Sequence, residues 1–272
     1  MALRLGFSSC PNDTFAFHAL VHGLVPFAEA LAPVIEDIEA LNERALARDD
    51  ARRLPLTKLS VGVLPAAASR YAVMRAGAAL GRGCGPLVVT RSDRACELAA
   101  LAGRRVAIPG VHTTAWMLLR AFAPAVEPVA MRFDRIMAAV EAGEVAAGLV
   151  IHEGRFTYAA RGLVSIADLG VLWEADTGMP LPLGVIAADR SLDAGLVGHF
   201  EDALSDSVAR ARRDPAPSRA WIREHAQELD DDVTARHIAL YVNDFTVDLG
   251  SEGRRAIDEL LARAGGSPSP WR

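Results

Sequence analysis

The sequence predicts an α/β fold with two lobes, a central cleft and two chain crossings. Short apolar strands alternate with helices through residues 3–151, and the glycine-rich segment 77–85 separates two such series. A proline-rich segment, Met179–Gly184, then precedes Val185–Ala188, which is typical of a strand that returns to the first lobe. A chain that leaves one α/β lobe and returns to it crosses between lobes twice, which predicts a cleft and hinge closure.

Length and composition favour a folded globular protein of one large or two modest domains. The chain has 272 residues, of which 51% are hydrophobic and 23% are charged. With 29 basic and 34 acidic side chains the net charge is −5, and no basic stripe is present, so nucleic acid is not an expected partner. No apolar run approaches the roughly 20 residues that span a bilayer, so membrane insertion is not expected.

The cysteines indicate a reducing compartment. Cys10, Cys84 and Cys96 are too few and too unevenly spaced for a disulfide framework, and none forms a Cys-x-x-Cys pair. The first residues enter a strand without the charged and apolar regions of a secretory signal. We therefore expect a cytoplasmic protein.

The first lobe is predicted to be the larger, discontinuous one, comprising residues 1–87 and 184–272. Its expected strands are Leu3–Ser8, Ala32–Ile38, Leu56–Leu59 and Val185–Ala188, and its expected early helices are Asn12–Val21 and Glu39–Ala47. Ser60 is placed to cap a small-residue helix that follows the third strand. Apolar stripes predict later helices at Gly195–Arg212, Pro217–His225, Asp231–Asn243 and Glu252–Ala264. The tail, Gly265–Arg272, is expected to be loose.

The second, smaller lobe is predicted to comprise residues 88–183. Its expected strands are Pro86–Thr90, Arg105–Ile108, Val126–Arg132 and Ala146–Ile151, and its expected helices are Ala115–Ala123 and Phe133–Ala142. Thr113 or Thr114 opens the first of these helices. Both lobes therefore repeat the strand–helix order that predicts open sheets flanked by helices.

Polar residues gather where predicted strands end and helices begin. These junctions are Ser8–Thr14, Thr57–Ser60, Pro109–Thr114 and His152–Glu153. Ligands of open α/β sheets bind beyond the carboxyl ends of strands, where helix N-termini present free N–H groups. Hydroxyls, Lys58 and a histidine at such positions suit a small ligand that bears a carboxylate. Each hydroxyl could equally be a helix cap, and Lys58 could be a solvated surface charge.

His152 is the candidate proton-transfer group, because its strand ends abruptly in a titratable side chain. It could instead be a surface histidine, and Gly154 would let the backbone turn sharply after it. Phe156 occupies the position of the second histidine in His-Glu-x-x-His, which excludes that type of zinc site. His18 and His22 have metal-ligand spacing without an evident third ligand, and Cys10 is better explained as a buried thiol than as a nucleophile.

Several segments, taken together, resemble the 1,4-dihydroxy-6-naphthoate synthase family of the futalosine route to menaquinone. They include Ile-His-Glu at 151–153 and His-Thr-Thr at 112–114. The full set is Phe7–Phe15, Leu54–Ser60, Gly81–Val89, Pro109–Thr114, Ile151–Thr157, Thr177–Gly184, Glu224–Glu228 and Tyr241–Asn243. Ser9 and Gly154 depart from the common pattern of the family, at positions that affect loop shape.

The resemblance implies the fold of type II periplasmic binding proteins, a cytoplasmic location and no metal or other cofactor. It implies a lyase that converts cyclic dehypoxanthinylfutalosine to 1,4-dihydroxy-6-naphthoate, with His152 as proton acceptor. The substrate contacts that it implies are Lys58, Leu59, Ser60, Thr113 and Thr114. Asn12 and Asp13, in the first junction, are expected to bind substrate as well.

Two other functions remain open at this stage. Chorismate dehydratase belongs to the same pathway and shares the fold, which alone cannot separate the two enzymes. A non-catalytic binding protein for a small carboxylate would also have this architecture. The Ile-His-Glu and His-Thr-Thr matches favour the synthase. The residue types do not indicate an oligomeric state.

Overall fold

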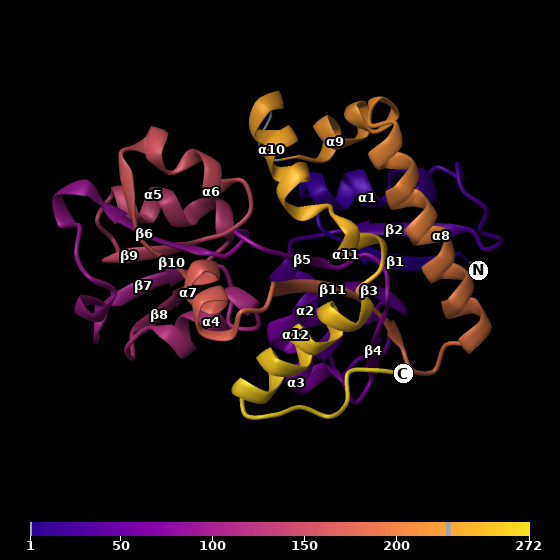
Figure 1. Ribbon diagram of the computed structural model, residues 1–272, viewed down its shortest axis with the longest axis horizontal. Coiled ribbons are helices and arrows are strands. Elements are labelled where there is room, and N and C mark those ends of the chain that lie inside the picture. Colours follow the sequence, from indigo (N-terminus) through magenta and orange to yellow (C-terminus); the bar gives the residue numbers. More distant parts are fainter. Residues whose placement is uncertain (1, 227–229) are drawn as a thin grey trace. The chain divides into compact units, whose positions relative to one another are not determined.

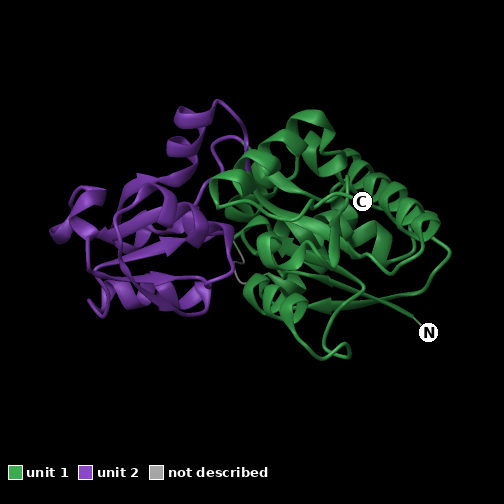
Figure 2. Ribbon diagram, turned by 90° about the horizontal axis from the view of Figure 1, so that it is seen from below, with its two compact units in different colours: residues 1–81, 182–272 green, residues 82–181 purple. Residues whose placement is uncertain are grey.

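The computed structural model describes residues 2–226 and 230–272, and the chain divides into two compact units (Figure 2). Unit 1 contains Met1–Gly81 and Pro182–Arg272, and unit 2 contains Arg82–Leu181. The chain therefore passes from one unit to the other twice. The segment Glu224–Glu228, part of the family resemblance, lies partly outside the described residues.

The segment before the first strand of unit 2 is held by unit 2 itself. The N–H of Gly83 donates to Glu174 Oε1 at 2.6 Å. Gly85 packs so closely on Gly170 that a Cβ on either residue would collide with the backbone of the other. These contacts explain why residues 82–87 group with unit 2, whereas the sequence placed the boundary after residue 87.

Unit 1 is built on a mixed sheet with the strand order β2-β1-β3-β11-β4, in which β5 also pairs with β11. Its strands are β1 (Leu3–Phe7), β2 (Leu31–Ile35), β3 (Leu56–Ser60), β4 (Tyr71–Val73), β5 (Ala79–Gly81) and β11 (Leu181–Asp189). Strands β1, β2 and β3 are parallel, and β11 is antiparallel to β3 and β4. The carboxyl ends of β1 and β3 consequently lie at the same edge of the sheet.

The helices of unit 1 pack on this sheet or on one another: α2 lies against β1 and β3, and Figure 1 shows α8 running beside α1. They are α1 (Pro11–Val21), α2 (Ile38–Leu46), α3 (Leu64–Ala67), α8 (Ala194–Arg213), α9 (Arg219–His225), α10 (Asp231–Tyr241), α11 (Asp244–Val247) and α12 (Gly250–Arg263). Alternate residues of β1 face opposite layers. Phe7 stacks on Phe17 of α1 at 4.6 Å, whereas Gly6 faces Leu41 of α2, where a Cβ would be crowded.

Unit 2 has its own sheet, with the strand order β10-β6-β9-β7-β8. Its strands are β6 (Leu87–Arg91), β7 (Arg105–Ile108), β8 (Glu127–Ala130), β9 (Ala147–Val150) and β10 (Leu163–Asp168), and its helices are α4 (Thr114–Phe122), α5 (Ile136–Glu141), α6 (Gly154–Thr157) and α7 (Leu169–Thr177). Strands β7, β8 and β9 are parallel, and β6 is antiparallel to β9 and β10. Gly148 of β9 lets Ile136 and Val140 of α5 approach the sheet closely.

Short 3₁₀ segments complete the connections, at Val61–Val63, Ser92–Arg94, Leu98–Leu101, Phe133–Arg135, Ala159–Arg161 and Ala216–Ser218. The strands and helices expected from the sequence are present with shifted ends, which confirms the α/β class. Strands β4, β5 and β10 and helices α6, α7 and α11 were not expected. Most of these are short, and pairing with β11 or β6 fixes the three strands. None of the described helices is both long and apolar enough to cross a membrane.

The prediction of a loose tail at Gly265–Arg272 is wrong. The carbonyl of Pro270 accepts the N–H of Val73, the last residue of β4, at 2.7 Å. Trp271 donates its indole N–H to Asp258 Oδ1 at 2.8 Å. The tail thus covers the edge strand of the sheet. The polar residues and prolines of its sequence gave no indication of this packing.

Acidic pH is expected to destabilise unit 1 through His18, a buried residue of α1. Burial, and then the charges of His22 and Arg210, lowers the pKa of His18. A group whose folded pKa is depressed contributes stability above its unfolded pKa of about 6.5, and this contribution is lost as the pH falls through the folded value. The midpoint of thermal unfolding should therefore fall between about pH 7 and about pH 5.

The control is His18→Gln, measured in the same buffers. Its unfolding midpoint should vary less over that pH window than the midpoint of the wild type. Equal pH dependence of the two proteins would show that His18 is not responsible.

Candidate functional site

The first group of predicted site residues lies where β1 and β3 end. Gly6 pairs with Thr57, so these parallel neighbours bring Ser8 and Ser60 to the same edge of the sheet in unit 1. Helix α1 begins just beyond, at Pro11. The polar side chains at this edge are all buried: Ser8, Asn12, Asp13, Lys58 and Ser60. Lys58 is only 6% exposed, so the alternative of a solvated surface charge is wrong.

The carboxylate of Asp13 is the centre of this group. Its Oδ2 accepts from the N–H of Ser8 at 3.1 Å and from the Ser8 hydroxyl at 2.5 Å. Its Oδ1 accepts from the Asn12 amide at 2.8 Å and from the ammonium group of Lys58. A buried charge is tolerated only when it is paired and hydrogen-bonded, and four donors satisfy this carboxylate.

Asn12 connects this group to α10. Its Nδ2 donates to Asp13, so its Oδ1 faces Nε2 of His237 at 2.9 Å. An amide oxygen can only accept, so Nε2 of His237 carries a hydrogen. The contact fixes the first turn of α1 to a helix more than two hundred residues later in the chain.

Ser60 does not cap the helix that follows it, which corrects the sequence prediction. It occupies the N-cap position of the 3₁₀ segment, but its side chain makes no capping bond. Its hydroxyl instead accepts the amide N–H of Asn42 at 3.0 Å, and its own N–H donates to Asn42 Oδ1 at 2.9 Å. Leu59, the preceding residue, has no exposed side-chain surface.

The second group lies at the edge of the sheet in unit 2. Val106 pairs with Ala147, so β7 and β9 are parallel neighbours whose carboxyl ends lie together. Thr113 is the N-cap of α4: its hydroxyl accepts from the N–H of Trp116 at 3.2 Å and donates to the carbonyl of Gly110 at 2.8 Å. Thr114, the first residue of the helix, is also buried.

His152 follows β9 with a strained backbone. Its φ is 55°, and it is the one residue other than glycine with positive φ in the described part of the chain. For a residue with a Cβ this conformation costs about 1–2 kcal/mol, and such strain is concentrated at functional sites. Its ring meets Phe133 edge to face, with centroids 4.9 Å apart. The imidazole direction is therefore fixed by the backbone and by an aromatic neighbour.

The sharp turn was expected at Gly154, and the structure places it at His152 instead. Gly154 has a different role, since a Cβ there would collide with Cγ1 of Val150. The glycine therefore provides room for α6 to pack against the end of β9.

Arg155 anchors the loop that carries His152. Its guanidinium donates to the carbonyl of Gly85 at 2.5 Å and to Asp168 Oδ2 at 2.6 Å. The other oxygen of Asp168 accepts the N–H groups of Gly170 and Val171 and so caps α7. This pair of contacts, to a carbonyl and to a carboxylate, was not predicted from the sequence.

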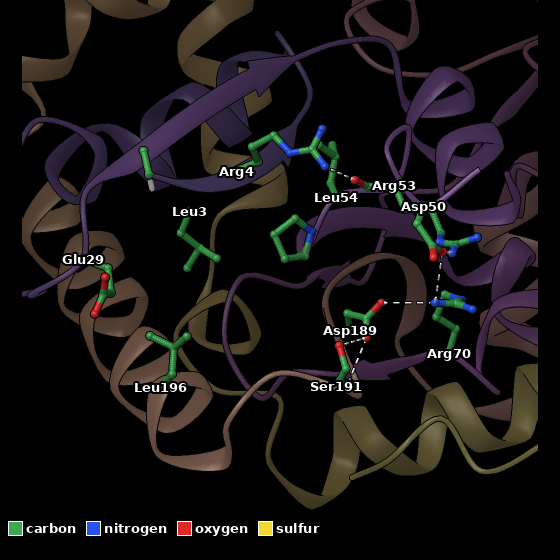
Figure 3. A pocket seen from close by; sticks show the side chains of 12 residues that line it. Leu3, Arg4, Glu29, Asp50, Arg53, Leu54, Arg70, Asp189, Ser191 and Leu196 are labelled. Carbon is green, nitrogen blue, oxygen red and sulfur yellow. Dashed lines mark hydrogen bonds and ion pairs between the residues drawn. The ribbon is translucent and has the colours of Figure 1, made fainter. Parts of the chain in front are cut away.

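The opposite edge of the sheet in unit 1 has a pocket of about 520 Å³ (Figure 3). Its lining includes Arg4, Arg53 and Arg70, but these cations are already engaged. Arg4 donates to the backbone of Arg53 at 2.7 Å, and Arg70 lies 3.7 Å from Asp189. The pocket lies beside the amino ends of β1 and β3, remote from Ser8 and Ser60.

Cys10, His18 and His22 are the other candidates that the sequence offered for a nucleophile or a metal site. Cys10 and Cys84 are buried, and burial raises the pKa of the Cys84 thiol to about 12. No set of three His, Cys, Asp or Glu side chains in residues 2–226 and 230–272 is arranged to hold a metal ion. Nδ1 of His22 is occupied by the carbonyl of His18 at 2.8 Å.

Comparison with known proteins gives a consistent result. The family model described as menaquinone biosynthesis matches residues 3–265. A protein of Thermus thermophilus named 1,4-dihydroxy-6-naphthoate synthase is 52% identical over 97% of this chain and 94% of its own length. A protein of Streptomyces coelicolor with the same name is 48% identical over 96% of this chain and 92% of its own.

Solved structures show the fold. A protein of Archaeoglobus fulgidus superposes with a TM-score of 0.90 at 35% identity, covering 97% of each chain. The alkanesulfonate-binding protein SsuA of Xanthomonas axonopodis has a TM-score of 0.71 at 18% identity, covering 99% of this chain and 95% of its own. The predicted similarity to periplasmic binding proteins is confirmed at the level of fold.

The ion pair of Lys58 and Asp13 yields a stability prediction. Asp13→Asn leaves a buried ammonium group without its counter-ion, which should lower the free energy of unfolding by about 3–5 kcal/mol. The matched control is the double variant Asp13→Asn with Lys58→Met, which removes both charges and should recover much of the loss. Urea unfolding measures all three proteins, and a double variant no more stable than the single one would contradict the assignment.

Proposed function

The chain belongs to the menaquinone biosynthesis family, and we propose on that premise that it is a 1,4-dihydroxy-6-naphthoate synthase. The proposed reaction converts cyclic dehypoxanthinylfutalosine to 1,4-dihydroxy-6-naphthoate. Two relatives of that name, similar over nearly the full chain, support it. The observation in the structure that carries the proposal is the strained, ring-packed His152 at the carboxyl end of β9.

His152 is the proposed general base. An imidazole titrates near neutral pH, so it can accept a proton from an acidic C–H or O–H group of the substrate. Removal of that proton starts an elimination or a retro-aldol-like cleavage, and formation of an aromatic product drives it. The packing of Phe133 and the anchoring of the loop by Arg155 support this role, because a general base must be held within hydrogen-bond reach of its proton.

Developing negative charge on oxygen is assigned to the donors at the helix start in unit 2. The Thr113 hydroxyl and the N–H of Trp116 are engaged with each other in capping, so Thr114 and the backbone N–H of Ala115 are the proposed donors. The N-terminus of a helix favours an anion through its exposed N–H groups and its dipole. Preorganised donors of this kind stabilise an oxyanion in the transition state.

Unit 1 is proposed to bind the carboxylate of the substrate through Lys58 and Ser60. Lys58 donates one hydrogen to Asp13, which leaves further donor capacity on its ammonium group. Asp13 and Asn12 are proposed to support Lys58 rather than to contact substrate, because their polar atoms are engaged with Ser8, Lys58 and His237. We also propose the cytoplasm as the location, in keeping with a chain that has only three cysteines, of which Cys10 and Cys84 are buried.

Product analysis separates this function from the two alternatives. Incubation with cyclic dehypoxanthinylfutalosine and, separately, with chorismate is followed by mass spectrometry. A dihydroxynaphthoate product supports the synthase, and an enolpyruvyl-benzoate formed from chorismate would identify a chorismate dehydratase. Recovery of both compounds intact would indicate a binding protein, which is how the neighbour from Xanthomonas is named.

His152→Asn tests the base. Asparagine tolerates the left-handed conformation but cannot accept the proton as imidazole does, so kcat should fall by about 10²- to 10⁴-fold. The fold and the affinity for product should change little. The matched control is His199→Asn, at an exposed position of α8, which should keep the wild-type kcat. Wild-type turnover in His152→Asn would remove this residue from the mechanism.

Thr114→Val tests the helix start. The substitution preserves shape and removes the hydroxyl, so KM should rise by up to about tenfold with little change in thermal stability. Thr90→Val is the control: this buried threonine donates to the carbonyl of Ala146 at 2.9 Å, away from the carboxyl ends of β7 and β9. It should lower the unfolding midpoint and leave KM unchanged. A Thr114→Val protein that loses stability without losing affinity would make Thr114 structural.

A further inference from the structure

We propose that Asn42 is a positioning residue that makes the Ser60 hydroxyl a hydrogen-bond donor to the anionic group of the substrate. The inference rests on the proposed function, since it explains how Ser60 acquires its role in that site. Asn42 lies on α2 and is fully buried, so it has no exposed surface with which to contact a ligand. It acts through its two hydrogen bonds to Ser60.

The orientation of the Asn42 amide follows from chemistry. Oxygen and nitrogen of an amide side chain are exchanged by a flip, and only the partners decide between the two positions. The backbone N–H of Ser60 can only donate, so the Asn42 atom 2.9 Å from it is the oxygen. The amide nitrogen then faces Ser60 Oγ at 3.0 Å.

A second partner gives the same orientation independently. The Asn42 nitrogen lies 3.2 Å from Oε2 of Glu39, one turn earlier on α2. A carboxylate only accepts, and an inverted amide would set two oxygens against each other. Both amide hydrogens of Asn42 are thus engaged, one by Ser60 and one by Glu39.

These contacts define which hydrogen bonds the Ser60 hydroxyl accepts and which it can donate. Its Oγ accepts from Asn42, so its own hydroxyl hydrogen must point to another acceptor. Among residues 2–226 and 230–272 this hydroxyl donates no hydrogen bond, and Ser60 is only 4% exposed. A buried donor without an acceptor is unfavourable, and a substrate carboxylate would satisfy it.

The position of Ser60 supports an anionic acceptor. It ends β3 two residues after Lys58, at the edge where β1 and β3 finish. Both hydrogen bonds from Asn42 restrict the end of the strand and the rotamer of the hydroxyl. A neutral donor held in one direction beside a cation is suited to a carboxylate, since hydrogen bonds to a charged partner are the stronger kind.

A double-mutant cycle of Asn42→Asp and Ser60→Ala tests the inference. The new carboxylate would still accept the N–H of Ser60 but would also accept its hydroxyl hydrogen, which turns the donor away from substrate. Each single variant should raise KM for cyclic dehypoxanthinylfutalosine about tenfold, with a smaller effect on kcat. KM of the double variant should also rise by only about tenfold, because after Ser60→Ala the new carboxylate at position 42 has no hydroxyl to redirect.

Acidic pH supplies a second measurement. A protonated carboxyl regains an O–H donor, so KM of Asn42→Asp should recover toward that of the wild type between about pH 8.5 and about pH 6. Thermal unfolding of every variant accompanies the assays. A merely structural role of Asn42 would lower stability and would not produce a coupling that depends on the Ser60 hydroxyl.

The outcomes separate this inference from the proposed function. If the wild type turns over and KM of the double variant rises by the product of the two single effects, about hundredfold, the role of Asn42 is overturned and the proposed function is unaffected. Absence of turnover by the wild type would overturn the function. In that case, the affinity of the same four proteins for benzoate is measured by calorimetric titration. A coupling between the Asn42 and Ser60 substitutions supports the inference. Additive effects on the binding free energy, or no binding of benzoate to the wild type, overturn it.

Discussion

The buried ion pair between Lys58 and Asp13 is the interaction on which the site of unit 1 depends. It joins the end of β3 to the first turn of α1, and its carboxylate gathers the donors of Ser8 and Asn12. Two charges removed from water are tolerated only with this degree of hydrogen bonding. The network also extends to α10 through His237, so residues from three distant parts of the chain are held in one polar group.

The site of unit 2 is organised by backbone geometry instead of a buried charge pair. His152 adopts a left-handed conformation, Phe133 packs against its ring, and Arg155 anchors the following turn. Strain of this kind persists only where the surroundings determine the conformation. A side chain fixed in this way would need little reorganisation to accept a proton, which is the role proposed for His152.

Some of this could be predicted from residue patterns. The strand-end rule located the junctions at Ser8–Thr14, Thr57–Ser60, Pro109–Thr114 and His152, because parallel strands collect their carboxyl ends at one edge. The packed tail at Pro270 and Trp271 was missed, since its contacts are with residues far away in the chain. The sharp turn was assigned to Gly154 on conformational preference, which tertiary packing overrode by straining His152.

The sequence by itself determined the α/β class, the family and the polar segments at the strand ends, because periodicity and local motifs are properties of neighbouring residues. The tertiary structure decided which partner each polar group has. Lys58 is buried beside Asp13 and not solvated, and Ser60 faces Asn42 and not its own helix. Hydrogen-bond polarity depends on atoms brought together from distant positions in the chain, and no local pattern contains that information.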